Sequence, residues 1–247
     1  MTEQTRRGFH ADIEEISELV VRLAARVGDS VARATDALLN YDLAAAQRVI
    51  DDDGSIDVAA FEIEEQCQNL LALQQPMAGD LRQILATMLI IGELERTGGL
   101  ACNICKGARR MFRTELPPRL RGLIAEMNEE AIRLIRLSVD SYSEHDSALA
   151  GALDDIDDRL DNLHRSFIQS LLEASRSHDL EVQPAVQLAL IARYYERIGD
   201  HAVNISDRVR YMVSGEMPWR EEQLGARLEE LPTDPADVSL NGETKTD

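Results

Sequence analysis

Residues 193–216 read RYYERIGDHAVNISDRVRYMVSGE and carry two patterns at once. The apolar residues recur at alternating spacings of three and four, which is the period of an amphipathic helix. On the opposite face of that helix, acidic residues stay in register over three turns. The apolar residues are Tyr194/Tyr195, Ile198, Ala202, Ile205, Val209 and Met212, and the opposite face carries Glu196, Asp200 and Asp207, with Asn204 slightly to one side. The stretch therefore predicts a long helix with an ordered acidic stripe.

An earlier part of the chain repeats this pattern. GELERTGGLACNI at 92–104 matches RYYERIGDHAVNI at 193–205 with an offset of 101 residues, and DDDGSID at 51–57 matches DDIDDRLD at 154–161. Self-similarity at a fixed offset indicates a duplicated structural unit. The only Pro-Pro pair of the chain lies between the copies, in ELPPR at 115–119. We therefore predict one unit over 1–115, a second over 116–217, and a disordered acidic tail over 218–247.

Helical periodicity runs through both units. The pattern predicts helices over about 9–39, 43–74, 77–112, 119–142, 147–177 and 182–213. Aromatic residues make up only 4% of the chain, which suits helix-on-helix packing better than a sheet. We expect an all-α fold of six long helices, arranged as two tandem three-helix bundles.

The charge balance excludes several classes of protein. The formal net charge is −19, from 45 acidic against 26 basic residues, so a nucleic acid is not an expected partner. No apolar run is long enough to span a bilayer, and the N-terminus lacks the apolar segment of a signal peptide. Three cysteines, an odd number, suit a reducing compartment. We expect a cytoplasmic protein that reaches the membrane only through its partners.

Pairs of carboxylates one helical turn apart are the strongest chemical signal. The pairs are Asp53 with Asp57, Asp157 with Asp161, and Glu196 with Asp200. Four carboxylates from two facing helices repel one another unless a cation neutralises them. Oxygen donors suit iron, manganese or magnesium, whereas zinc prefers nitrogen and sulfur and is the less suited candidate. The alternative is that these acids are solvated faces of an acidic helical protein.

Other motifs carry less chemistry. The CNIC segment at 102–105 lacks the second cysteine pair that a structural zinc site needs, so we expect its thiols in the core. DNLH at 161–164 resembles half of a di-iron carboxylate/histidine motif, but it has no second copy, so His164 is expected at the surface or between helices. With no glycine-rich phosphate loop and no obvious nucleophile, the sequence does not predict an enzyme.

The stretch from Tyr194 to Glu216 closely resembles the repeat signature of the PhoU family of phosphate-transport regulators. QQPMAGDLRQIL at 74–85, with Asp80 and Arg82, resembles the family's other recurring segment. The resemblance spans about residues 9–216. It implies a pair of three-helix bundles that bind metal clusters on one face. It also implies repression of the phosphate-starvation response by coupling the phosphate ABC transporter, with its ATPase, to a sensor histidine kinase.

Carried over by position, the resemblance implies one metal site in each repeat. The second-repeat site is Asp157, Asp161, Glu196 and Asp200, with Asn204 and Asp207 nearby; the first-repeat site is Asp53, Asp57 and Glu95, with Asn103 nearby, and Asp80 and Arg82 are further candidates for supporting contacts. The first repeat departs from the pattern, because Gly99 replaces the expected aspartate and Lys106 stands where the second repeat has Asp207. We expect the second site to bind metal at least tenfold more tightly.

Two other functions remain open on the sequence. The first is a carboxylate-bridged metalloenzyme on a helical bundle, and the second is a helical scaffold that binds no metal. The metalloenzyme needs buried ligands and paired histidines, yet the acidic stripe lies opposite the apolar residues. We also expect a homodimer, since long two-lobed bundles commonly leave an apolar flank and the family resemblance favours assembly.

Overall fold

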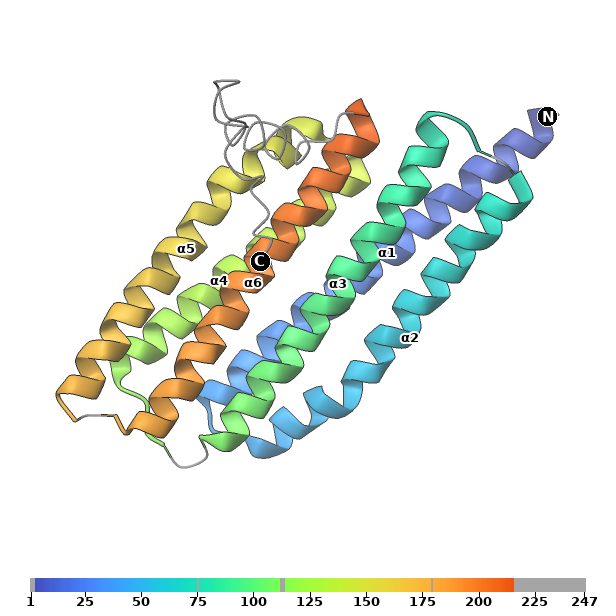
Figure 1. Cartoon of the computed structure of the whole chain (residues 1–247). Helices are drawn as coiled ribbons and strands as arrows, with labels where there is room; N and C mark the ends of the chain where they lie inside the picture. Colours follow the sequence, from blue (N-terminus) through green and yellow to red (C-terminus); the bar gives the residue numbers. More distant parts are fainter. Residues whose placement is uncertain (1–2, 75, 112–113, 179, 216–247) are drawn as a thin grey trace, which may run out of the picture.

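The computed structural model describes residues 3–74, 76–111, 114–178 and 180–215. Six long α-helices make up almost all of this part of the chain (Figure 1). They are α1 (Glu3–Leu39), α2 (Leu43–Gln74), α3 (Gly79–Arg110), α4 (Pro118–Glu144), α5 (Ser147–Arg176) and α6 (Val182–Ser214).

The helices form two three-helix bundles that lie side by side. Helices α1, α2 and α3 pack on one another in the first bundle, and α4, α5 and α6 do so in the second. The bundles meet where α3 packs against α6 and α1 packs against α4. In Figure 1, α3 and α6 run antiparallel through the centre of the view, and α2 and α5 lie on the two outer sides. The acidic face of each bundle is therefore built by one outer helix and one central helix.

The turn between the first two helices has nearly the same backbone geometry in both bundles. Tyr41 and His145 both adopt left-handed backbone conformations, with φ of 56° and 55°. The aspartate that follows each of them caps the next helix: Asp42 accepts a hydrogen bond from a backbone N–H of α2, and Asp146 accepts two from α5. These equivalent turns set an offset of 104 residues for this part of the repeat, which places Asp53 over Asp157.

Two buried hydroxyl pairs tie the bundles together. Tyr195 on α6 lies 2.6 Å from the hydroxyl of Thr35 on α1, and Tyr142 on α4 lies 2.7 Å from the hydroxyl of Thr87 on α3. Both tyrosines are almost fully buried, so their hydroxyls need partners inside the protein. Each pair joins one bundle to the other, and the bundles therefore share a single core.

The predicted fold class is confirmed: six long helices form two three-helix bundles. The predicted start of the first helix at residue 9 was too late, because α1 begins at Glu3. Residues 3–8 lack apolar periodicity, but glutamate, glutamine and arginine are good helix formers and extend the helix. The predicted tail at 218–247 lies outside the described residues, and the boundary at 115/116 stays a prediction. Among the described helices, none has the length and apolar character that crossing a bilayer requires.

Candidate functional site

The acidic stripe of the second repeat is brought together by α5 and α6. Asp157 and Asp161 lie one turn apart on α5, and Asp200 reaches them from α6. Burial raises the pKa of Asp157 to about 7, and the charges of Asp161, Asp200, Asp154 and Asp158 add to this effect. The Oδ1 atom of Asp157 is buried without a hydrogen-bond partner. A carboxylate in such surroundings attracts a proton or a cation.

A glycine on α6 makes room for this carboxylate. A β-carbon at Gly199 would lie 2.2 Å from Oδ1 of Asp157 and 2.9 Å from Cδ2 of Leu160. Both distances are too short for a β-carbon, so a larger residue at this position would displace the carboxylate of Asp157 and the end of the Leu160 side chain. The glycine next to Asp200 thus lets the carboxyl group of Asp157 lie against the backbone of α6.

An arginine lies within the same stripe. Arg193 forms ion pairs with Glu196, one turn on, and with Asp200 at 3.8 Å. His164 on α5 lies on this face too: burial and then the charge of Arg193 lower its pKa, and Asp161 opposes them. The four predicted ligands of the second repeat therefore lie on neighbouring helices, with Arg193 supplying a positive charge to two of them.

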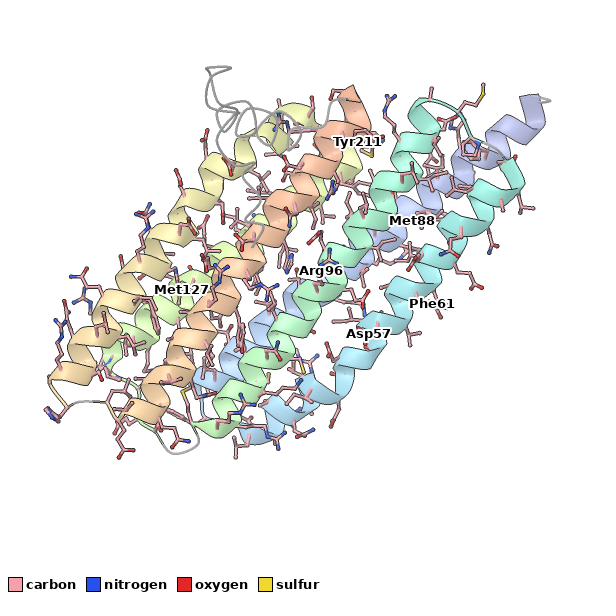
Figure 2. The ribbon with its side chains drawn as sticks, viewed as in Figure 1. Asp57, Phe61, Met88, Arg96, Met127 and Tyr211 are labelled. Atoms are coloured by element: carbon pink, nitrogen blue, oxygen red, sulfur yellow. The ribbon has the colours of Figure 1, made fainter. Side chains whose placement is uncertain are left out.

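The first repeat brings together a different set of side chains. Asp53 on α2 interacts with Asp57 one turn on, and with Cys102 and Lys106 on α3. Burial and the charge of Asp57 raise the pKa of Asp53, whereas a hydrogen bond from Cys102 and the charge of Lys106 oppose the rise. Asp57 on α2 and Arg96 on α3 are labelled in Figure 2 and mark this side of the first bundle. Glu95, the third predicted ligand, is exposed on α3.

The predicted supporting residues are dispersed along the central helices. Asp207 is half-buried and forms an ion pair with Arg210 at 3.6 Å, while Asn204 is exposed and Asn103 half-buried. Asp80 is half-buried in the first turn of α3. Arg82 donates a hydrogen bond to the carbonyl oxygen of Met212, at the opposite end of α6 from its first turn. Its contact lies twelve residues beyond Asp200, or about 18 Å along the helix.

One buried polar group on the central helices was missed by the sequence analysis. Glu93 on α3 lies 2.6 Å from Nδ1 of His201 on α6, and Arg96 donates a second hydrogen bond to it at 2.6 Å. Burial acts to raise the pKa of Glu93, but the hydrogen bonds from His201 and Arg96 outweigh it, and the pKa is lowered. Glu93 precedes the predicted ligand Glu95 by two residues, so it points to a different side of α3. The pair lies between the bundles and joins them.

The three cysteines behave as the sequence predicted for the CNIC segment. Cys67, Cys102 and Cys105 are all buried and free of disulfides. Burial raises the pKa of Cys105 to about 12, so its thiol stays protonated. Within the described ranges, no group of three or more His, Cys, Asp or Glu side chains is placed to hold a metal ion. In the second-repeat stripe, the positive charge beside Glu196 and Asp200 is that of Arg193.

Comparison with known proteins assigns the family. A family model described as the PhoU domain matches the chain twice, over residues 20–108 and 124–209. The chain belongs to the PhoU family. A phosphate-specific transport system accessory protein, PhoU homolog 2 of Mycobacterium tuberculosis, is 36% identical over 214 residues, which are 86% of this chain and all of that protein. A PhoU homolog of Rhizobium meliloti is 30% identical over 213 residues, covering 86% of this chain and 90% of its own.

Solved structures of the family have the same fold. The crystal structure of PhoU from Pseudomonas aeruginosa superposes with a TM-score of 0.78 at 26% identity, over 84% of this chain and all of that one. The PhoU regulatory protein of Streptococcus pneumoniae gives the same TM-score at 23% identity, over 85% and 98% of the two chains. The PhoU resemblance noted in the sequence is confirmed by these matches, and the chain is a family member over both of its repeats.

Proposed function

We propose that this PhoU-family chain is a non-enzymatic, metal-binding regulator of phosphate uptake that works in the cytoplasm. The observation that supports the metal site best is the buried, unpartnered Oδ1 atom of Asp157 beside Asp161 and Asp200. Together with Glu196, these residues offer four carboxylates from two helices. Iron, manganese or magnesium suits this donor set better than zinc.

The bound metal would supply positive charge to a cluster of like charges. Asp157, Asp161, Glu196 and Asp200 would hold the ion, and α5 and α6 would be tied together by it. Glycine at position 199 leaves room for the carboxylate of Asp157 beside α6. Metal loading would thus stabilise one side of the second bundle.

The regulatory role is proposed from the relatives, which are named phosphate-specific transport system accessory proteins. We propose that this chain acts as a homodimer that represses the phosphate-starvation response, by coupling the ATPase of the phosphate ABC transporter to a sensor histidine kinase. Deletion of its gene should leave phosphate-starvation genes switched on in phosphate-rich medium. Unchanged reporter expression in a strain without any second copy of the gene would refute this role.

A metal-free scaffold is the competing proposal, and Arg193 favours it. The guanidinium group already pairs with Glu196 and Asp200, so part of the stripe has a cation of its own. Elemental analysis of the purified protein, after chelation and reloading with iron or manganese, separates the two proposals. One bound equivalent or more per chain that is lost in Asp157→Asn supports the metal site, and none supports the scaffold.

A further inference from the structure

We infer that this chain forms a closed dimer through two exposed apolar rows, one on each central helix. The α3 row is Leu81, Leu85 and Leu89, and the α6 row is Val182, Val186 and Leu190. In the dimer, the α3 row of each copy packs on the α6 row of the other copy. The inference rests on the homodimer of the proposed function and names the surface that holds it together.

The two rows occupy equivalent positions in the two repeats. Members of a row follow one another at spacings of four residues, so they share one side of their helix. The offset of 101 residues places each member of the α3 row over one member of the α6 row. Their exposed fractions are 36–47% on α3 and 42–74% on α6. A single exposed leucine is ordinary, but a row that recurs on the same turns of both central helices marks an interaction surface.

Both rows lie on the same face of the molecule, at opposite ends. Helix α3 packs against α1, α2 and α6, and α6 packs against α3, α4 and α5. Figure 1 shows α1 and α4 behind the two central helices, so the remaining sides of α3 and α6 point the same way. Because α3 and α6 are antiparallel, their first turns lie far apart. About 35 Å of α3 separates Leu85 from Arg110, which donates a hydrogen bond to Gln187 beside the α6 row.

The end of this face that holds the α3 row is acidic. The second half of α2 lies beside the first half of α3, because the two helices form an antiparallel pair. From residue 49 to residue 74, α2 carries acidic residues and no basic ones. Two bases near the α3 row are already engaged: Arg82 donates a hydrogen bond to the carbonyl oxygen of Met212, and Arg210 pairs with Asp207. The α3 row is thus bordered by unbalanced negative charge.

The end that holds the α6 row is basic. The last turns of α3 run beside the first turns of α6 and carry three exposed bases, Lys106, Arg109 and Arg110. The acids of this end are Glu181, just before the row, and Glu173, which pairs with Arg119. Two rows of the same apolar character therefore have borders of opposite charge.

This arrangement identifies a second copy of the chain as the occupant. One row of three side chains is small, since a stable interface takes about 20–30 residues from each partner. A second copy presents the same two rows at the same separation, so it can cover both rows together. Pairing the α3 row with the α6 row brings the acidic end of one copy to the basic end of the other, in two contacts related by a two-fold axis. Pairing each row with itself would place the acids of α2 against one another.

The first test introduces a charge into either row of the full chain. Leu85→Glu and Val186→Glu each place a carboxylate in both contacts and should raise the Kd of the dimer by about 100-fold or more. In sedimentation velocity at about 10 µM, we expect a dimer for the native chain and a monomer for each variant, with unchanged circular dichroism. The matched control is Val21→Glu on α1, which is 40% exposed and lies outside both rows; it should remain a dimer.

Three results of this test would overturn the inference. If either row variant stays dimeric, or if Val21→Glu dissociates, the copies meet through another surface, and the homodimer of the proposed function survives without this interface. If the native chain is a monomer, the inference and the proposed homodimer both fail. The regulatory role is then still decided by the reporter strain.

The second test determines which rows meet. A mixture of Leu85→Glu with Val186→Lys should form a dimer, although each variant alone is a monomer. In the crossed pairing, one contact of the mixed dimer joins the glutamate to the lysine, and the other contact is native. If each row packed on itself, both contacts would keep an unpaired charge, and no dimer in the mixture would overturn the crossed pairing.

Two further outcomes would assign the rows to another occupant. Particles that grow beyond a dimer as the native protein is concentrated would indicate an open, head-to-tail contact. Flotation of the native chain, but not of Leu85→Glu, with vesicles of phosphatidylcholine and phosphatidylglycerol would indicate a lipid surface. Either result would overturn the closed dimer.

Discussion

The Oδ1 atom of Asp157 lies 2.2 Å from the position that a β-carbon on Gly199 would occupy. Leu160 is also too close, at 2.9 Å, so neither the carboxylate nor the leucine can stay in place beside a larger residue. The positions of both side chains against α6 therefore depend on the glycine. Several properties of the second bundle can be tested from this contact.

Gly199→Ala should destabilise the protein by about 1–3 kcal/mol, the usual cost of overpacking a close helix contact. It should also weaken metal binding, because Asp157 is displaced. The matched control is Gly99→Ala, where no atom lies within 4 Å of the added β-carbon. That change should stabilise α3 by about 0.5–1 kcal/mol. Equal Tm values for the two variants would show that the α5–α6 contact is not tight.

Asp157→Asn should have opposite effects with and without metal. The pKa of Asp157 in the folded protein is about 7, above its ordinary value of 3.8, so the folded state binds the extra proton between these pH values. Its contribution to stability is present at low pH and is lost as the pH rises toward 7. The amide cannot ionise, so in chelator at pH 8 the variant should have the higher Tm. With Mn²⁺ present, the native chain should gain stability that the variant does not. Chelated Tm values that stay equal from pH 5 to 8 would contradict the raised pKa.

Alanine at Glu196 or Asp200 should remove most of the bound metal, whereas Glu95→Ala should change little. The second repeat offers one more acid than the first and has Asp207 where the first has Lys106, a difference of three charges. For a divalent ion, each charge contributes about 1 kcal/mol at roughly 8 Å in water. Elemental analysis at matched protein concentration measures the effect. Similar metal loss from Glu95→Ala and Glu196→Ala would refute it.

Glu93→Gln should lower the free energy of unfolding at neutral pH. It should also make that free energy depend less on pH in the acidic range. The pKa of Glu93 is lowered in the folded protein, so its stabilising effect is present above the unfolded value of 4.5 and is lost as the pH falls through the lower folded value. Removing the charge from this buried pair should cost about 1–3 kcal/mol at pH 7. Glu95→Gln, two residues away and exposed, is the control. Denaturant titrations at pH 3 to 7 measure this, and parallel pH profiles for the native chain and Glu93→Gln would contradict the contribution of the pair.

Tyr195→Phe should cost about 0.5–1.5 kcal/mol, because it removes only the hydroxyl that bonds Thr35. The neighbouring Tyr194→Phe removes a hydroxyl from a half-buried position on the same helix and should have little effect. Chemical denaturation of both variants measures the difference. Indistinguishable midpoints would mean that the Tyr195–Thr35 bond adds nothing to the contact between the bundles.

The helices and the repeat could be predicted from the sequence because they depend on local patterns. Apolar residues at spacings of three and four determine which face of a helix is buried, and the repeated acids fall on matching turns. The meeting of Asp157, Asp161 and Asp200 follows from those patterns, since helices joined by short turns pack antiparallel and present equivalent faces. The alignment of the two repeats could also be predicted, because Asp42 and Asp146 both precede a helix as capping residues.

The contacts that depend on tertiary packing could not be predicted in this way. Glu93 and His201 are 108 residues apart, and their meeting depends on how α3 and α6 rotate about their axes when the bundles pack. Arg193 could point to solvent or along the stripe, and only its spacing of three residues to Glu196 hinted at the second choice. The influence of Cys102 on Asp53 was equally hidden, because the thiol belongs to an apolar helix face that the sequence assigned to the core.

The two hydroxyl pairs between the bundles are asymmetric with respect to the sequence repeat. Each of the four hydroxyl groups has a buried aliphatic residue at the matching position of the other repeat; these are Leu94 for Tyr195, Val139 for Thr35, Leu188 for Thr87 and Leu38 for Tyr142. A chimaera with two first repeats would retain both threonines and lose both tyrosines, and one with two second repeats would do the reverse. Each half thus carries buried hydroxyl groups that bond a hydroxyl group of the other half. The two repeats of this chain therefore pack together as two non-identical, complementary units. One repeat can no longer replace the other.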